Sequence, residues 1–133
     1  MAVIYKTTDK IRYKIGEIEV ALSPLSSQQK AQLTETMSKA AKGDYSAAME
    51  GSLLTIQNCL KEISGVTNSD GSPYELEFQD GILTRECAED LTNMEQSTSL
   101  VQLCAQYLAG IPSELPEGVT LKPMGKKTTK KQR

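Results

Sequence analysis

The chain has 133 residues, 24% of them charged, and this length suits one domain with an ordinary core. It has one Phe and no Trp, so the core must be mainly aliphatic. It has no His, which excludes Ser-His-Asp and Cys-His catalysis and His-ligated metal sites. No apolar run approaches the ~18 residues of a membrane-spanning helix, and the start lacks a signal-peptide pattern. We therefore expect a soluble, cytoplasmic protein.

Charge is divided unevenly between the body of the chain and its end. Residues 118–133 hold six cations and no acid, whereas the other 117 residues hold nine cations and 17 acids, a net charge of −8. An acidic body repels nucleic-acid phosphates, and the basic end has no aromatic residues that would stack on bases. The composition therefore disfavours a nucleic-acid-binding regulator that acts through this end.

The segment 10–22, KIRYKIGEIEVAL, alternates apolar and charged residues on both sides of Gly16-Glu17. A period of two with Gly at the turn predicts a β-hairpin. Its first strand is cationic and its second acidic, so charges can pair across it. An isolated hairpin is only marginally stable, so we expect it to pack on helices or on a partner.

Two helices are predicted next. Ser26 and Gln29 have the spacing of a capping box, and Gly43 ends a first helix that has a thin apolar stripe. Asp44 can cap a second helix that runs to Ser64 and carries the clearest apolar stripe in the chain. We expect this second helix to be the centre of the core.

The second half of the chain contains a loop, an alternating segment and two more helices. Residues 65–73 have the composition of a loop, and 74–81 alternate, which predicts a short edge strand or an extended arm. Thr84 is a good N-cap for a helix over 85–94. Ser97 is predicted to cap a last helix, which ends at Gly110 and Pro112.

These elements predict an α+β fold that is mainly α, with about four helices and an N-terminal β-hairpin. Residues 1–112 form a single helical domain in this interpretation. From residue 113 the chain is rich in Pro, Gly and Lys, and 113–133 is predicted to be a flexible, disordered basic tail.

No motif for catalysis, cofactor binding or metal binding emerges. The run GKKT at 125–128 lacks the first Gly of a phosphate-binding loop, and Asp70-Gly71 lacks EF-hand spacing. Cys59, Cys87 and Cys104 lie on apolar helical stripes without metal spacing, so we expect them to be buried. The sequence thus favours a binding or assembly protein over an enzyme and predicts no cofactor.

The order of the hairpin KIRYKIGEIEVAL, the helix opening SPLSSQQKAQL and the Lys-rich end MGKKTTKKQR resembles the tail assembly chaperones of lambda-like long-tailed bacteriophages, in their short form. The resemblance implies a protein of the infected host's cytoplasm that self-associates, coats the tape measure protein, keeps it soluble and is absent from the mature virion. From the composition and the missing motifs we expect no small-molecule substrate and no membrane among its partners, and the acidic body disfavours nucleic acid.

The resemblance also implies a longer product, made by a −1 ribosomal frameshift near the end of the gene, which recruits the tail tube protein. Met has the single codon ATG, so a codon GGA at Gly125 followed by Lys126 would give a slippery heptamer. The candidate frameshift site therefore comprises Met124, Gly125, Lys126 and Lys127. The pairs Lys126-Lys127 and Lys130-Lys131 also allow a heptamer A AAA AAR, if the preceding codon ends in A.

Self-association requires exposed apolar groups. The candidates are apolar residues of the hairpin and of the thin-striped first helix, namely Ile11, Tyr13, Ile18, Val20, Leu33 and Met37. Periodicity leaves open that these residues are ordinary core. The alternative function is a virion component, such as a head–tail connector or a tail terminator subunit.

Overall fold

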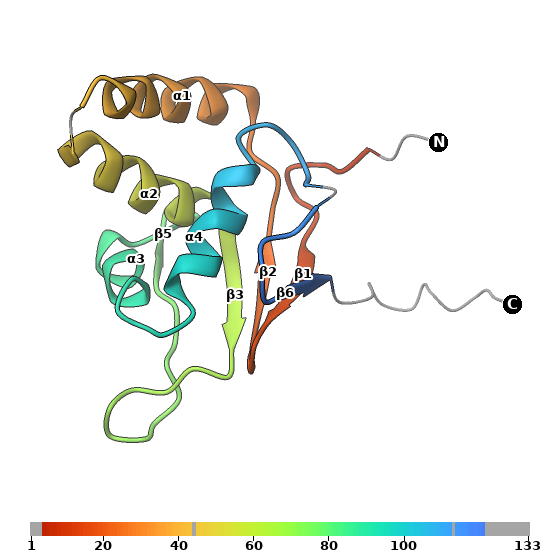
Figure 1. Ribbon diagram of the computed structural model, residues 1–133. Coiled ribbons are helices and arrows are strands. Elements are labelled where there is room, and N and C mark those ends of the chain that lie inside the picture. Colours follow the sequence, from red (N-terminus) through yellow and green to blue (C-terminus); the bar gives the residue numbers. More distant parts are fainter. Residues whose placement is uncertain (1–3, 44, 113, 122–133) are drawn as a thin grey trace, which may run out of the picture.

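Residues 4–43, 45–112 and 114–121 are described by the computed structural model in Figure 1. Within this part, four helices lie on one side of a four-stranded antiparallel sheet, and a two-stranded hairpin lies beside the helices. The predicted α+β class is confirmed. In chain order the elements are β1 (Ile11–Ile15), β2 (Ile18–Leu22), α1 (Ser27–Ala41), α2 (Tyr45–Cys59), β3 (Leu60–Ser64), β4 (Phe78–Gln79), β5 (Ile82–Leu83), α3 (Arg85–Leu91), α4 (Ser97–Gln106) and β6 (Val119–Leu121).

The N-terminal hairpin forms as predicted and occupies the middle of the sheet, whose strand order is β3-β2-β1-β6. Its register runs from Ile11 opposite Leu22 to Ile15 opposite Ile18, so two residues make the turn. Gly16, the first of them, has a φ of 61°, which glycine adopts without steric cost. The apolar face of both strands is buried against the helices.

The predicted second helix ends early, at Cys59. Leu60–Ser64 form β3, which pairs antiparallel with β2. Leu60 fits a helical stripe, but in the strand it lies opposite Leu22 and is 0% exposed. The backbone N–H of Ser23 donates to the Cys59 carbonyl at 2.9 Å. The strand depends on a partner far away in the sequence, so the local apolar pattern did not reveal it.

The sheet also gains a strand where a tail was predicted. Val119–Leu121 form β6, which pairs antiparallel with β1. Val119 lies opposite Ile15 and is buried, and its N–H donates to the Pro116 carbonyl at 3.1 Å. The boundary predicted at residue 113 is therefore wrong, because an isolated valine supplies enough apolar surface to complete the sheet. Residues 122–133 lie outside the described part of the chain.

The helix caps follow the local sequence at two of the three predicted sites that the structure describes, and the fourth, Asp44, lies outside the described residues. At the start of α1, the Ser26 N–H donates to Gln29 Oε1 at 2.8 Å and the Gln29 N–H donates to Ser26 Oγ at 3.1 Å. At α3, Thr84 Oγ1 accepts from the Cys87 N–H. At α4 the cap is Gln96 rather than Ser97, and its side chain makes no capping hydrogen bond.

The core between the helices and the sheet is aliphatic except for one tyrosine pair. Tyr13 and Tyr107 are each 1% exposed, their rings meet edge to face with centroids 6.5 Å apart, and their hydroxyls share a hydrogen bond of 2.8 Å. Burial raises the pKa of both phenols above the ordinary value. The pair joins β1 to the C-terminal end of α4.

Candidate interaction surfaces

Most of the residues predicted to make contacts between copies lie in the interior of a single chain. These five side chains are at most 3% exposed: Ile11, Tyr13, Ile18, Val20 and Leu33. The prediction that they form an exposed surface is therefore wrong, because the helices already cover the apolar face of the hairpin. The alternation correctly placed the apolar residues of the hairpin on one face of each strand, but that face is the buried one.

Met37, the sixth candidate, is half-buried between the first two helices. Its side chain lies against Gly51 of α2, and a Cβ added at Gly51 would overlap Met37 Sδ. The glycine inside α2 is thus explained by close packing of α1, which offsets its low helix propensity. Met37 therefore packs against α2 of its own chain.

The open face of the sheet is charged. Glu62 of β3 accepts from Arg12 Nη1 at 2.7 Å and from Lys10 Nζ at 2.8 Å. These two hydrogen bonds lower the pKa of Glu62 to about 2. All three side chains are more than 40% exposed, so the pairs contribute little stability. The face opposite the core is therefore polar.

Apolar side chains are exposed on the short hairpin of β4 and β5, as they also are at Ile4, Met49 and Leu121 elsewhere in the described chain. Phe78 is 42% exposed and Ile82 is 40% exposed. The two strands are joined by Asp80-Gly81, with φ of 55° and 80°, as expected for a type I′ turn. Leu83 is the residue that anchors the hairpin, since it is 0% exposed. The hairpin is thus fixed by one strand and presents apolar surface from both.

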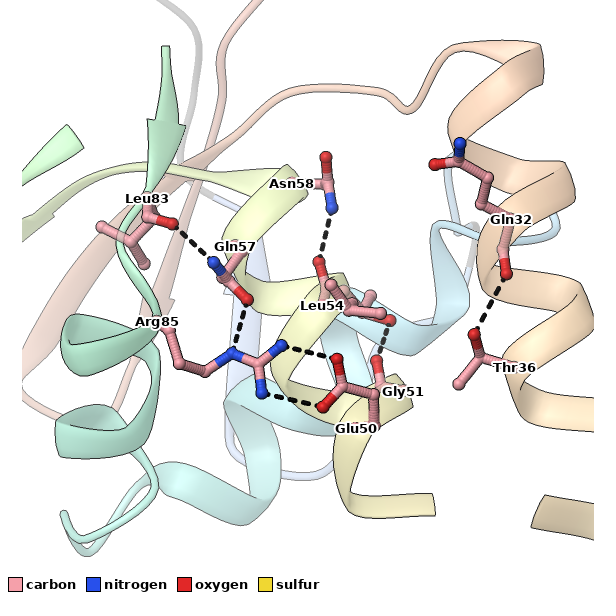
Figure 2. A network of polar contacts seen from close by, with 10 residues as sticks. Gln32, Thr36, Glu50, Gly51, Leu54, Gln57, Asn58, Leu83 and Arg85 are labelled. Atoms are coloured by element: carbon pink, nitrogen blue, oxygen red, sulfur yellow. Dashed lines mark hydrogen bonds and ion pairs between the residues drawn. The ribbon is translucent and has the colours of Figure 1, made fainter. Parts of the chain in front are cut away.

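A polar clamp holds this hairpin and α3 to α2 (Figure 2). Arg85 donates to both carboxylate oxygens of Glu50, at 2.8 and 2.6 Å, and to Gln57 Oε1 at 2.9 Å. Gln57 in turn donates to the Leu83 carbonyl at 2.9 Å. The Arg85 hydrogen bonds lower the pKa of Glu50. A bidentate pair fixes orientation as well as distance, so the clamp sets the position of the exposed hairpin.

Next to the hairpin lies a groove, here named the Tyr74 groove, on both sides of the Tyr74 ring. Two adjoining hollows of about 600 and 400 Å³ share Asn68, Tyr74 and Asp90. The Tyr74 hydroxyl donates to Asp90 Oδ2 at 3.0 Å. Burial raises the pKa of Tyr74, and the neighbouring Cys87 and Asp90 raise it further. The hydroxyl therefore stays protonated at neutral pH.

Apart from the Tyr74 groove, a separate hollow of about 460 Å³ lies at the C-terminal end of α4. Tyr5, Leu25 and Tyr107 line it together with Lys30 and the turn around Gly110. It is open to solvent and contains one cation and no acid among its lining residues. Its apolar walls extend the core rather than forming a separate site.

The predicted burial of Cys59, Cys87 and Cys104 is confirmed, and all three thiols are free. Within the described ranges, no group of three or more His, Cys, Asp or Glu side chains could hold a metal ion. The helices of that same part include none that could span a membrane. The four residues of the candidate frameshift site, 124–127, lie outside the described residues.

Comparison with known proteins leaves the family open, since the chain matches no protein-family model, no curated protein and no solved structure.

The exposed hairpin was missed although the sequence contains a signal for it. Asp80-Gly81 between alternating residues is a strong short-range indicator of a two-residue turn. The sequence predicts that 74–81 is extended, but it predicts no partner strand at Ile82-Leu83, where the structure has β5. The turn dipeptide was the observation needed to find this hairpin, which exposes one apolar side chain from each of its two strands.

Proposed function

We propose that this protein is a tail assembly chaperone of a long-tailed bacteriophage. In this role it self-associates, coats the tape measure protein, keeps it soluble and helps to recruit tail tube subunits before the virion is complete. The order of elements on which the resemblance rests, an N-terminal hairpin followed by a helical body, is also the order in the folded chain.

The observation that carries the proposal is the exposed β4–β5 hairpin beside the open Tyr74 groove. Phe78 and Ile82 form a small apolar surface on a hairpin that is held in place by the polar clamp of Arg85 and Glu50. A long, largely helical protein coated by many copies requires modest repeated contacts rather than one deep pocket, because multivalency multiplies weak affinities. A small apolar patch in an acidic body suits such contacts, since net charge keeps the assembly soluble.

Co-expression with the tape measure protein encoded in the same genome tests the proposal. We expect the wild-type chain to keep the tape measure protein in the soluble fraction and to co-purify with it in many copies. The double variant Phe78→Ser/Ile82→Ser should lose most of this activity while retaining its own fold. Ile4→Ser is the matched control, because Ile4 is 87% exposed but lies in the N-terminal segment.

Two results would contradict the chaperone role. One is that the wild-type chain neither co-purifies with the tape measure protein nor changes its solubility. The other is abundant presence of the chain in purified virions, which mass spectrometry would detect and which fits a connector or terminator subunit.

The longer product is tested separately by the nucleotide sequence of codons 124–127. We expect a slippery heptamer there and an overlapping −1 open reading frame downstream. Without them the frameshift is excluded at this site, while the contact between the β4–β5 hairpin and the tape measure protein would be unaffected.

A further inference from the structure

The Tyr74 groove combines an apolar hollow with an acidic one. Val66, Leu91 and Met94 line the larger hollow. Glu75, Glu77 and Glu86 line the smaller hollow and Asp90 lines both, and these four are here named the rim carboxylates. No Lys or Arg lines either hollow within the described part of the chain. An occupant of this groove should therefore be cationic and should have methylene stems that can lie on apolar surface.

The rim carboxylates are available for such an occupant. Asp90 accepts from the Tyr74 hydroxyl, whereas Glu75, Glu77 and Glu86 are exposed and their carboxylates have no hydrogen bond or ion pair among the described residues. Like charges gathered along one groove repel one another, so a cation that enters gains from several of them. The Tyr74 ring adds a surface over which an ammonium group is attracted.

The chain itself contains a segment with the required chemistry. Residues 122–133 hold six cations, no acid and a methionine in a stretch of twelve residues. Fully extended, twelve residues reach about 40 Å. We propose that residues 122–133 of one copy dock in the Tyr74 groove of a second copy.

The sheet topology favours a second copy over the same chain. In the register of the sheet, Leu121 of β6 and Ile63 of β3 lie in one row, three strand spacings or about 14 Å apart. β3 leads from that row through Gly65 toward Val66 and the groove. β6 runs antiparallel to β3 and ends on the opposite edge of the sheet (Figure 1). The chain at Leu121 is therefore directed away from its own groove, and docking there would require residues 122–133 to turn back across the sheet, whereas docking on a second copy would not.

Such a contact is heterologous, because the donor segment and the acceptor groove are different parts of the molecule. Heterologous contacts that do not close into a ring produce open chains of subunits. This inference deepens the self-association in the proposed function and rests on that part of it, but its test uses this chain alone, so it can fail while binding to the tape measure protein stands. It predicts that self-association is electrostatic and sensitive to salt.

Sedimentation velocity of the full chain at low and high salt tests the proposal. We expect association at about 50 mM salt that weakens by about tenfold or more at about 500 mM, where the Debye length is short. The groove variant Glu77→Lys/Glu86→Lys and a tail variant with the six cations changed to Ser should each lose association by at least a similar factor. The control is Glu17→Lys/Glu35→Lys, which makes the same charge change at exposed residues outside the groove.

Mixing the groove variant with the tail variant shows whether residues 122–133 dock in the groove of a second copy or in the groove of their own chain. The groove variant supplies an intact tail and the tail variant an intact groove, so together they should form a one-to-one complex that neither forms alone. As a second check on folding, the groove variant combined with Lys126→Glu/Lys127→Glu should recover association.

Three outcomes would overturn the proposal. They are association that is unchanged in the groove variant, a mixture that remains monomeric, and a wild-type chain that is monomeric at low salt. Loss of nucleic-acid binding without loss of self-association in the tail variant would assign the basic segment to a nucleic acid instead.

Discussion

Two hairpins of this protein have the same local design but differ in burial: the apolar residues of one are core, whereas two of the other are exposed. β1–β2 and β4–β5 are both antiparallel pairs joined by two-residue turns with positive φ at the first turn position. The N-terminal hairpin lies in the middle of a four-stranded sheet, with β3 and β6 beside it and helices over one face. Among the described residues no further strand pairs with the β4–β5 hairpin, and two of its apolar residues remain exposed. The neighbours of a hairpin, not its alternation, decide whether its apolar residues become core or surface.

The largest difference between the two hairpins should appear in stability. Leu22 is 0% exposed, so Leu22→Ala removes buried apolar atoms and leaves a cavity. We expect it to lower the free energy of unfolding by about 2–5 kcal/mol. Phe78→Ala, at a side chain 42% exposed, should cost about 1 kcal/mol or less. Urea unfolding followed by circular dichroism measures both, and equal losses would contradict the assignment of core and surface.

A smaller effect is expected at the tyrosine pair that anchors the N-terminal hairpin to α4. Tyr107→Phe leaves the buried Tyr13 hydroxyl without its partner, which should cost about 1–3 kcal/mol. Because the pKa of both phenols is raised in the folded state, the unfolded state ionises first as pH rises. Wild-type stability should therefore be complete below pH ~10 and fall above it, with a weaker fall in the variant.

Tyr5→Phe is the matched control for this pair, since the Tyr5 hydroxyl has no hydrogen bond among the described residues. Thermal unfolding at pH 7 and at several values above 10 provides the comparison. Equal stability of Tyr107→Phe and Tyr5→Phe would show that the hydroxyl pair contributes nothing.

The smallest effect is expected on the open face of the sheet. Glu62→Gln removes a carboxylate that pairs with Arg12 and Lys10, and exposure limits the loss to about 1 kcal/mol or less. The pKa of Glu62 is lowered from 4.5 to about 2. The stabilisation is therefore present above pH 4.5 and is lost as pH falls toward about 2. Wild type and variant should converge at the acid end, and a difference that persists at pH 2 would point to packing instead.

Local sequence was a good guide to the elements with local signals. The capping box at Ser26 and the N-cap at Thr84 formed as predicted, and the alternation in residues 10–22 marked the first hairpin. β3 and β6 could not be predicted this way, because each exists only through pairing with a distant strand. Without that partner strand, the local pattern places Leu60 in a helix and Val119 in a tail.

The prediction that the candidate contact residues are exposed was wrong for a related reason. An apolar face such as that of Ile11 and Val20 indicates burial but not whether the covering surface belongs to the same chain. Within one chain α4 and α2 already cover it. The Tyr74 groove was beyond prediction, since it brings residues 66–77 against α3 and none of its lining residues forms a motif.

Amide hydrogen exchange on the full chain, alone and bound to the tape measure protein, tests most directly whether the β4–β5 hairpin is the contact surface. We expect added protection over residues 74–83 and little change over 11–22, where the sheet already protects the backbone in the free protein. Added protection confined to other segments, with 74–83 exchanging as fast as before, would contradict this assignment.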